Sequence, residues 1–337
     1  MKINTKILKW YDLKKRVLPW RNRVKGNVDP YLIWISEIML QQTTVNAVIP
    51  YFNKFIKVYP NIFKLANSSL EDVLILWAGL GYYARARNLY KCSQIISKKY
   101  NGIFPNNVSE LRKLPGIGDY TAAAISSIAF NQVAFAVDVN IHRVISRLFN
   151  KHSISSKEIK FLMKNIISEN RPGDFTEALM DIGSQICKKR LPKCSLCPLI
   201  KDCLTFKFNH KKLDENKIIK KKKINKYGKC IIISRSIDKY IYFIRLPESG
   251  LFGGMLSLPI SEWVTKKESL SKFYRNKGLI KPNEEIRYEL SHFKLILYIY
   301  YLEDKKFIDF EGKWMPTKKA RPQLSSLMKK VIDKYVI

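Results

Sequence analysis

Four cysteines in the second half of the chain have the spacing of a metal-binding loop. Cys187, Cys194, Cys197 and Cys203 follow the pattern C-x6-C-x2-C-x5-C. Four thiolates on short loops can surround a [4Fe–4S] cluster or a structural zinc ion, because both need sulfurs that converge on one small site. The alternative is four buried structural thiols, but the lysines and arginine between them make the loop too polar for a core segment. Only one C-x2-C pair occurs, so the spacing favours an iron–sulfur cluster over zinc.

Two carboxylates of the chain could perform acid–base chemistry. Glu37 lies in the otherwise apolar segment Trp34–Thr43, and Asp138 lies just before a segment that becomes helical. The default role of Glu37 is a surface residue on a polar stripe, and that of Asp138 is a helix N-cap. If Glu37 instead faces a pocket, loss of solvent raises its pKa and keeps a proton available near neutral pH. Together the two residues would supply the carboxylates that cleavage of a glycosidic bond requires.

A glycine-containing turn, Leu-Pro-Gly-Ile-Gly-Asp-Tyr-Thr at Leu114–Thr121, lies between two helical segments. Gly116 and Gly118 permit a tight turn, and the helix that follows presents backbone N–H groups to an anion. A helix–hairpin–helix of this kind binds a DNA phosphate without reading the base sequence. A lone Gly-x-Gly also occurs in ordinary turns, but the residues on either side favour the DNA-binding interpretation.

The hydrophobic periodicity predicts that residues 1–205 form an all-α domain. Apolar residues recur every three or four positions in Pro30–Phe55, Leu70–Ala84, Leu89–Tyr100, Tyr120–Phe130, Asn140–Phe149, Lys157–Ile167 and Phe175–Cys187. Proline and glycine mark the boundaries between these segments. The hairpin, at about 111–130, and the cysteine loop, at 187–203, both fall inside this domain.

A change of composition predicts a second domain. Residues 206–226 are expected to be a basic linker, because ten lysines occur between Lys207 and Lys229 and the stretch has no hydrophobic period. Strand-like runs follow at Cys230–Arg235, Tyr240–Leu246 and Ile286–Leu302. We therefore predict a mixed α/β domain over residues 227–337.

The composition indicates an intracellular protein that binds a polyanion. A formal net charge of +33 predicts salt-sensitive attraction to phosphates, although an AT-rich genome that enriches lysine is an alternative source of the charge. No signal peptide is recognised, and no apolar run approaches the ~20 residues of a membrane span. Four metal-binding cysteines indicate a reducing compartment and leave Cys92 and Cys230 as free thiols. We expect a cytoplasmic protein, associated with the nucleoid if it is bacterial.

Longer motifs accompany these features along nearly the whole chain. They are Leu18–Arg21, Ser36–Thr43, Trp77–Asn88, Leu114–Ala122, Met180–Gly183, Gly250–Gly254, Leu258–Pro259 and Leu290–Phe293. With the hairpin, the aspartate after it and the cysteine loop in this order, the chain resembles the MutY-type adenine DNA glycosylases of the endonuclease III superfamily. The resemblance implies a helix–hairpin–helix glycosylase fold with one [4Fe–4S] cluster per chain, followed by an α/β Nudix-like domain.

The resemblance also implies catalytic roles. Glu37 would protonate N7 of adenine and make the base a neutral leaving group. Asp138 would stabilise the oxocarbenium-like sugar, or trap it covalently, before water arrives. Asn140 and Tyr120 would orient these two carboxylates.

Further residues would contact the DNA and the base. Gln42 and Tyr82 would wedge into the duplex as the adenine flips out, which costs roughly a few kcal/mol. The base pocket would be lined by Trp20, Arg21 and Glu177. Trp20 and Tyr82 are equally compatible with roles as core aromatic residues.

Position 120 distinguishes two branches of the superfamily. The pyrimidine-lesion glycosylases with lyase activity carry a lysine there, which forms a Schiff base with the sugar. The phenol of Tyr120 cannot form that imine, so the resemblance favours a monofunctional glycosylase.

The C-terminal domain resembles the Nudix-like domain with which adenine glycosylases recognise 8-oxoguanine. The acidic metal-binding helix of Nudix hydrolases has no counterpart after Gly254, so this domain is expected to bind rather than hydrolyse. Ser291 and His292 match the loop that contacts 8-oxoguanine. Two positions depart from the family pattern: Leu290 replaces the usual Phe, and Val139 replaces a Gly common after the catalytic aspartate.

We therefore predict a monomeric base-excision repair enzyme. It would hydrolyse the N-glycosidic bond of adenine opposite 8-oxoguanine, and opposite guanine, in double-stranded DNA, which prevents G:C to T:A transversions. The alternatives are a bifunctional glycosylase–lyase for oxidised pyrimidines and a non-catalytic, metal-stabilised nucleic-acid-binding protein. A nucleotide-cleaving Nudix enzyme is a third alternative, and the missing metal helix argues against it.

Overall fold

The computed structural model describes most of the 337-residue chain. The described residues are 1–24, 27–151, 153–209, 223–235, 237–238, 240–270, 284–303 and 311–336. The chain divides into two compact units, Met1–Ser68 with Asn88–Ile218 and Ser69–Arg87 with Ile219–Ile337. Residues 210–222, which make up most of the predicted linker, lie outside the described residues.

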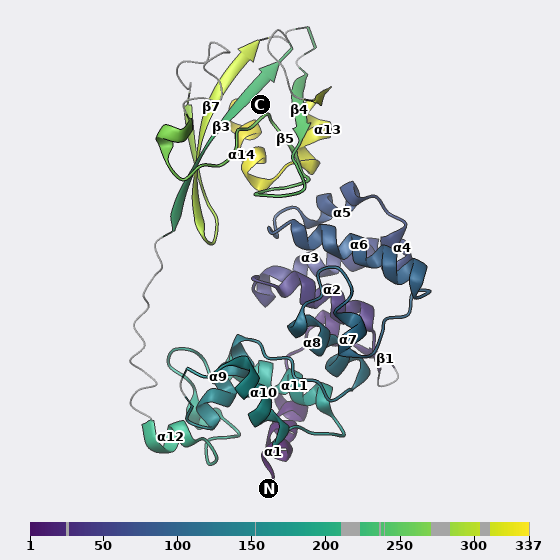
Figure 1. Cartoon of the computed structure of the whole chain (residues 1–337), viewed down its shortest axis with the longest axis vertical. Coiled ribbons are helices and arrows are strands. Elements are labelled where there is room, and N and C mark those ends of the chain that lie inside the picture. Colours follow the sequence, from purple (N-terminus) through teal and green to yellow (C-terminus); the bar gives the residue numbers. More distant parts are fainter. Residues whose placement is uncertain are drawn as a thin grey trace. The chain divides into compact units, whose positions relative to one another are not determined.

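The first unit is helical (Figure 1). Its elements are α1 (Ile3–Lys14), η1 (Pro19–Arg21), β1 (Arg23–Val24), β2 (Asn27–Val28), α2 (Pro30–Leu40), α3 (Val45–Val58), α4 (Ile62–Ala66), most of α6 (Ala84–Lys99), α7 (Val108–Leu111), α8 (Asp119–Phe130), α9 (Val139–Leu148), α10 (Ser156–Lys164), α11 (Pro172–Asp181), η2 (Ile182–Ile186), η3 (Cys194–Leu196) and α12 (Leu204–Asn209). The helical character predicted for this part of the chain is confirmed.

Helix α8 lies at the centre of the first unit, where it packs against both α2 and α11. Its small residues Ala122, Ala123 and Ala124 are buried and permit close approach of the neighbouring helices. A β-carbon on Gly173 of α11 would stand 2.7 Å from the backbone oxygen of Ser127, so only glycine fits there. This packing fixes the positions of the side chains that α2, α8 and α11 present to one another.

The predicted helical segments are interrupted where the backbone enters the left-handed region. The segment predicted at Pro30–Phe55 is two helices, because α2 ends at Leu40 and Gln42 has φ 58°. The prediction of continuous periodicity over this break was wrong. A single residue with positive φ carries no hydrophobic signal, so the period cannot reveal it. The break after α11 is of another kind: α11 ends at Asp181 and continues as the π-helical turn η2, with Asp181 and Ile182 in the right-handed region.

The second unit contains a six-stranded sheet with the order β5-β4-β3-β7-β6, in which β8 also pairs with β4. Its elements are α5 (Leu70–Trp77), β3 (Ile224–Ser234), β4 (Ile241–Arg245), β5 (Leu256–Ser257), η5 (Lys267–Leu270), β6 (Glu284–Glu289), β7 (Phe293–Glu303), β8 (Gly312–Met315), α13 (Thr317–Ala320), η7 (Arg321–Gln323) and α14 (Ser326–Tyr335). Strands β3 and β7 are parallel, and the other pairs are antiparallel. The predicted C-terminal domain with a sheet is therefore confirmed.

Alternate residues of β3 belong to two different hydrophobic clusters. Cys230 and Ile232 pack with residues of β7 and α14, whereas Ile231 and Ile233 pack in a separate cluster with Leu270. Because successive side chains of a strand point to opposite faces, both faces of the sheet are covered. This explains why the strand reads as an unbroken apolar run.

Residues 69–87 belong to the same unit as the sheet, and two arginines connect them to it. The buried Arg87 guanidinium donates hydrogen bonds to the backbone carbonyls of Glu248 and Gly253. Arg245 of β4 forms an ion pair of 2.9 Å with Glu71 of α5. The predicted domain limits, 1–205 and 227–337, differ from this division at residues 69–87.

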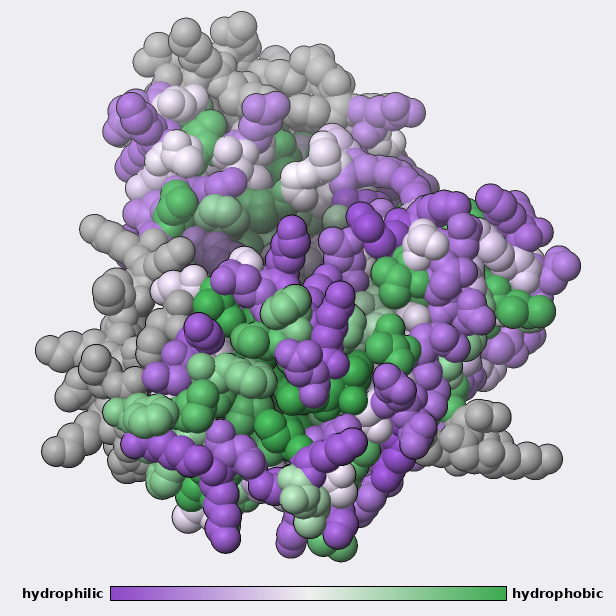
Figure 2. All heavy atoms as spheres, turned by 60° about the horizontal axis from the view of Figure 1, so that its bottom comes forward, coloured by the Kyte–Doolittle hydropathy of each residue, from purple (hydrophilic) through white to green (hydrophobic). Residues whose placement is uncertain are grey.

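The surface mixes polar and apolar side chains. Figure 2 shows hydrophobic residues gathered among hydrophilic ones on one face of the molecule. Large apolar side chains exposed in the first unit include Leu13, Val17, Val139, Phe161, Leu191, Leu196 and Phe208. Within the described residues, none of the helices has the length and apolar character needed to cross a membrane.

Candidate active site

Glu37 is buried rather than part of a surface stripe. It lies on α2, whose N-terminus is capped by Asp29 and begins with Pro30, and its exposed fraction is 7%. Burial raises the pKa of Glu37 from 4.5 to about 7, and the nearby charges of Asp138 and Glu177 act in the same direction. A hydrogen bond with Tyr120 opposes this shift. At neutral pH this carboxyl is therefore protonated in a large fraction of molecules.

Tyr120 lies in the first turn of α8 and is half-buried. Burial, followed by the negative charges of Glu37 and Asp138, raises the pKa of its phenol well above the usual 10. The phenol consequently keeps its proton and donates its hydrogen bond to Glu37. The structure thus brings Tyr120 and Glu37, predicted from motifs more than eighty positions apart, into direct contact.

Asp138 is the N-cap of α9, and both of its oxygens accept hydrogen bonds. One oxygen accepts from the backbone N–H of Ile141 at 2.6 Å. The other accepts from the side-chain amide of Asn140 at 2.8 Å. The capping role that the sequence suggested for Asp138 is therefore present, and Asn140 fixes the second oxygen.

A residue that the sequence analysis missed, Arg143, holds Asn140 in turn. Its guanidinium donates to Oδ1 of Asn140 at 2.8 Å and to the backbone oxygen of Gly183 at 2.6 Å. Its Nε donates to the backbone oxygen of Cys187 at 2.7 Å. The spacing of three residues between Asn140 and Arg143 on one helix was the available signal. These bonds connect the start of the cysteine loop to Asp138.

One cavity of about 40 Å³ contains the predicted base-pocket residues. Its lining includes Glu37, Trp20, Arg21 and Glu177, with apolar side chains around them. Arg21 and Glu177 form a buried ion pair, with Nε 2.8 Å from Oε1. Trp20 also packs edge-on against Phe52, so it serves the core and the cavity at once.

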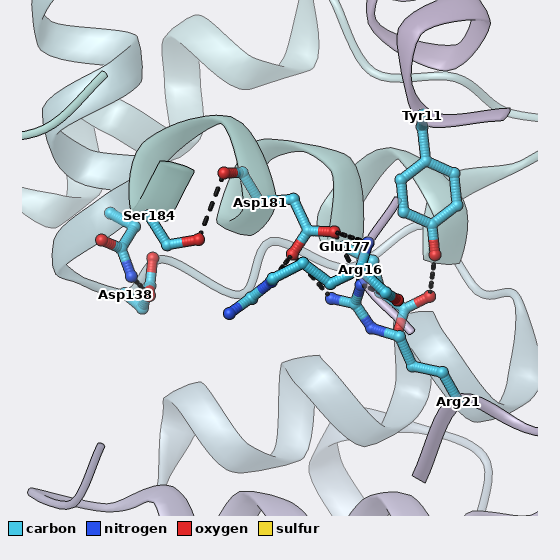
Figure 3. Close-up of polar contacts among 8 residues, drawn as sticks. Tyr11, Arg16, Arg21, Asp138, Glu177, Asp181 and Ser184 are labelled. Carbon is cyan, nitrogen blue, oxygen red and sulfur yellow. Dashed lines mark hydrogen bonds and ion pairs between the residues drawn. The ribbon is translucent and has the colours of Figure 1, made fainter. Parts of the chain in front are cut away.

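A buried polar network supports this ion pair (Figure 3). Asp181 is fully buried one turn after Glu177, and its carboxylate accepts from Arg21 at 2.7 and 3.1 Å and from Arg16 at 2.5 Å. The hydroxyl of Tyr11 donates to Glu177 at 2.6 Å. Burial alone lowers the pKa of Arg21, but the two carboxylates outweigh it and the net shift is upward. Motif matching included Arg21 and Glu177, but it did not identify Tyr11 or Arg16.

The four cysteines of the loop surround a second cavity, whose lining also includes Arg147 and Phe206. The sulfur of Cys187 accepts from Arg147 at 3.5 Å, and backbone N–H groups of Leu199 and of Thr205 and Phe206 lie against Cys197 and Cys203. Across the described residues, no group of three His, Cys, Asp or Glu side chains is arranged so that it could hold a metal ion. None of the six cysteines, all within the described ranges, forms a disulfide.

Comparison with known proteins identifies the family. Residues 35–169 match the HhH-GPD superfamily of base excision DNA repair proteins. An adenine DNA glycosylase of Buchnera aphidicola subsp. Baizongia pistaciae is 41% identical over 301 residues, which are 87% of this chain and 83% of the relative. The chain belongs to the adenine DNA glycosylases. The predicted family is confirmed.

Two solved structures resemble the helical part of this glycosylase. A thermostable thymine-DNA glycosylase aligns with a TM-score of 0.55 and 30% identity over 60% of this chain and 94% of its own. Endonuclease III, in a non-covalent complex with DNA, aligns with a TM-score of 0.51 and 26% identity over 63% of this chain and all of its own (100%). The predicted helix–hairpin–helix glycosylase fold is therefore confirmed.

The hairpin of this glycosylase leaves the start of α8 open. Gly116 has φ 78°, and a β-carbon on it would stand 2.9 Å from Cβ of Asn88. Gly118 is the N-cap of α8, with no side-chain cap and nothing within 4 Å of a β-carbon built on it. Arg112 and Asp119 form an exposed ion pair of 2.6 Å beside this opening. The positive φ of Gly116 favours glycine, whereas Gly118 has an ordinary φ of −88° and leaves the helix terminus without a side chain.

The two predicted wedge residues, one in each unit, both have a positive φ angle. Gln42 has φ 58° after the end of α2 and is exposed. Tyr82 has φ 50°, is 39% exposed, and lies 5.5 Å from the guanidinium carbon of Arg85. Positive φ at non-glycine residues is uncommon and costs energy, so both positions are strained.

The predicted lesion-contact residues lie at an exposed turn of the second unit. Ser291 and His292 connect β6 to β7, so the predicted run Ile286–Leu302 is two strands rather than one. The backbone N–H of Leu290 donates to the oxygen of Phe293 at 2.8 Å and closes this turn. Both side chains therefore stand at the tip of a hairpin, where they are open to solvent.

Proposed function

We propose that this glycosylase hydrolyses the N-glycosidic bond of adenine mispaired with 8-oxoguanine, and with guanine, in double-stranded DNA. The observation that carries the proposal is the buried Glu37, whose pKa is raised to about 7 in a cavity it shares with Arg21 and Glu177. Membership of the adenine DNA glycosylase family supports adenine as the base and DNA as the partner.

Glu37 acts as the general acid. It transfers its proton to N7 of the flipped adenine, so that the bond between the sugar C1′ and N9 breaks with the electron pair on a neutral base. A carboxylic acid with a pKa near 7 keeps enough proton at neutral pH to do this, whereas one at the ordinary value would be ionised. The hydrogen bond from Tyr120 holds the carboxyl in place.

Asp138 stabilises the positive charge that develops on the sugar. One of its oxygens is fixed by the α9 N-terminus and the other by Asn140, so the carboxylate cannot rotate freely. A preoriented anion lowers the energy of the oxocarbenium-like state because no reorganisation is needed as the charge appears. Water then adds to C1′ and completes the hydrolysis, directly or through a covalent adduct with Asp138.

The enzyme is monofunctional. A glycosylase–lyase needs an amine that forms an imine with the opened sugar, and position 120 offers a phenol instead. In this protein the phenol has a different task, since it donates to the catalytic acid. After base loss the product is therefore an intact abasic strand.

DNA is held by the hairpin and distorted by the wedges. The open α8 N-terminus after Gly118 binds a backbone phosphate through its N–H groups and dipole. Gln42 and Tyr82, each an exposed residue of its own unit, are the wedge residues that enter the duplex. The net charge of +33 supplies the long-range attraction.

The cysteine loop binds one [4Fe–4S] cluster. The chemistry of the donor set supports this, because four thiols line one cavity and backbone N–H groups and Arg147 face the sulfurs, as thiolate ligands require, although the described side chains are not arranged around a single metal ion. When bound, the cluster supplies four iron–sulfur bonds that hold residues 187–203 together. Free rather than disulfide-bonded cysteines support a reducing compartment.

The C-terminal unit is a Nudix-like binding domain that recognises 8-oxoguanine. Its support is a mixed sheet covered on both faces, together with Ser291 and His292 at an exposed turn. Hydroxyl and imidazole groups can hydrogen-bond the lesion's added oxygen and N7 hydrogen. Leu290 places an apolar side chain beside them, which can pack on the lesion base with a smaller contact area than the usual Phe.

A single-turnover assay tests the proposed function. Duplexes that carry 8-oxoguanine:A, G:A, 8-oxoguanine:C or thymine glycol are incubated with the monomeric protein and analysed with and without alkali. We expect alkali-dependent cleavage at adenine alone. Glu37→Gln and Asp138→Asn should bind the 8-oxoguanine:A duplex but react at least about a thousandfold more slowly. Alkali-independent nicking of thymine glycol would instead support a lyase.

A further inference from the structure

A tyrosine of the first helix contacts two of the charged residues that line the base cavity, Glu177 and Arg21. Tyr11 is 2% exposed, and its hydroxyl donates a 2.6 Å hydrogen bond to Oε2 of Glu177. The guanidinium carbon of Arg21 lies 6.0 Å from the centre of the Tyr11 ring. Figure 3 shows the phenol of Tyr11 directed toward Glu177, although the two residues are 166 positions apart.

The hydrogen bond between Tyr11 and Glu177 has one possible direction. Burial, and then the negative charge of Glu177, raise the pKa of the phenol far above 10, so the phenol keeps its proton. Glu177 is therefore the acceptor. Its other oxygen, Oε1, lies 2.8 Å from Nε of Arg21. Partners on both oxygens hold the carboxylate in one orientation at the cavity.

The second partner of Glu177 is itself anchored. Both terminal nitrogens of Arg21 donate to the fully buried carboxylate of Asp181, at 2.7 and 3.1 Å. Arg16 also donates to Asp181, through its backbone N–H and its Nε. Because Arg21 is anchored on the Oε1 side of Glu177, the hydrogen bond from Tyr11 fixes the Oε2 side.

We propose that Tyr11 is a positioning residue for base specificity, which holds Glu177 as a hydrogen-bond acceptor for the exocyclic amine of adenine. The inference rests on the proposed excision of adenine and adds to it a residue outside the cavity lining. A site built to accept an N–H donor discriminates strongly against a base that lacks the donor, since the acceptor is then left unsatisfied. Purine, which is adenine without the amine, is such a base.

The test compares adenine with purine in otherwise identical duplexes opposite 8-oxoguanine. Single-turnover rates are measured for the wild type, Tyr11→Phe and the control Tyr31→Phe. Tyr31 is a matched control because it is equally buried in the same unit and donates at 2.7 Å to the backbone oxygen of Tyr59, away from the cavity lining. Both substitutions remove one buried hydroxyl and keep the ring.

We expect Tyr11→Phe to slow adenine excision about tenfold or more and purine excision less than about threefold. Tyr31→Phe should leave the ratio of the two rates at the wild-type value. The ratio is measured within one preparation, so it does not depend on the fraction of folded enzyme. Adding Tyr11→Phe to Glu177→Gln should change the ratio no further, because Tyr11 acts through Glu177.

Equal slowing of both substrates by Tyr11→Phe would overturn the inference and leave Tyr11 a structural residue. An unchanged adenine rate, or a further change of the ratio in the double variant, would also overturn it. These outcomes all require that the wild type removes adenine. A wild type that removes neither base would refute the proposed function itself.

Discussion

Gly183 lies directly against Asn140. A β-carbon on Gly183 would stand 2.6 Å from Cβ of Asn140 and 3.0 Å from its backbone oxygen. Asn140 in turn donates the hydrogen bond that fixes the second oxygen of Asp138. The absence of a side chain at position 183, on a π-helical turn, is therefore a requirement of the site proposed to stabilise the sugar.

Gly183→Ala should slow adenine excision by about 10- to 100-fold, because displacing Asn140 by a fraction of an ångström misplaces Asp138. Single-turnover kinetics at saturating enzyme measure the effect. Ser184→Ala is the control. Ser184 lies on the same turn, and its hydroxyl donates a hydrogen bond of 3.1 Å to the backbone oxygen of Asp181. Equal rates for Gly183→Ala and the wild type would show that the turn can move without disturbing Asp138.

The rate of excision should depend on the ionisation of Glu37. Because burial raises the pKa of this carboxyl to about 7, the acid form predominates below pH 7 and disappears above it. We expect a single-turnover rate that is constant below about pH 6 and falls about tenfold per pH unit above pH 8. In Glu37→Gln, the remaining rate should no longer fall as the pH rises above about 8. An inflection near 4.5 would mean that burial does not raise the pKa of the catalytic acid, and a fall that persists in Glu37→Gln would mean that Glu37 is not the acid.

The same carboxyl should make stability depend on pH. Since its folded pKa, about 7, lies above the ordinary 4.5, folded protein keeps a proton between these values that unfolded protein has released. The stabilisation is fully present below pH 4.5 and is lost as the pH rises to about 7, by roughly 3 kcal/mol.

Glu37→Gln does not titrate at this position, so its stability relative to the wild type should increase over that pH window. Thermal unfolding at pH 5 and pH 8 measures the difference. The exposed Glu169, changed to Gln, is the control and should give a nearly constant difference. A constant difference for Glu37→Gln as well would show that Glu37 is solvated in the folded protein.

The cysteine loop should depend on iron. Protein prepared without oxygen is expected to be brown and to contain about four irons per chain. Cys197→Ser should lower the iron content and increase proteolysis between residues 187 and 203, whereas Cys92→Ser, at a buried cysteine outside the loop, should keep the iron. Stoichiometric zinc in colourless protein would refute the cluster.

The turn between β6 and β7 should determine the preference for 8-oxoguanine over guanine. Ser291→Ala with His292→Ala removes two exposed polar side chains and leaves the cavity around Glu37 intact. We expect the preference to fall by about 1 to 3 kcal/mol, with G:A excision nearly unchanged. Ser269→Ala, an exposed serine of the same unit, is the control. An unchanged preference would place lesion recognition elsewhere.

The sequence by itself determined the helical and sheet-containing parts, the family, and the residues that its motifs contain. These features are local. The helical period of three to four residues, the strand period of two, and the spacing of glycines and cysteines each depend on a few neighbouring positions. They could place Glu37 on a helix and Asp138 at a helix start. They could not show that Glu37 is buried, because a glutamate in an apolar helix is also compatible with a polar stripe.

Only the tertiary structure decided which distant residues meet. The contacts Tyr11 to Glu177 and Arg143 to Cys187 join residues 166 and 44 positions apart. Residues 69–87 belong to the unit that contains the sheet, and Arg87 hydrogen-bonds to the backbone oxygen of Gly253 there. No local sequence pattern predicts this contact. The physical reason is that hydrogen bonds, ion pairs and desolvation depend on distance in space, and helix packing sets those distances. The raised pKa of Glu37 arises in this way, from burial and from charges on other elements.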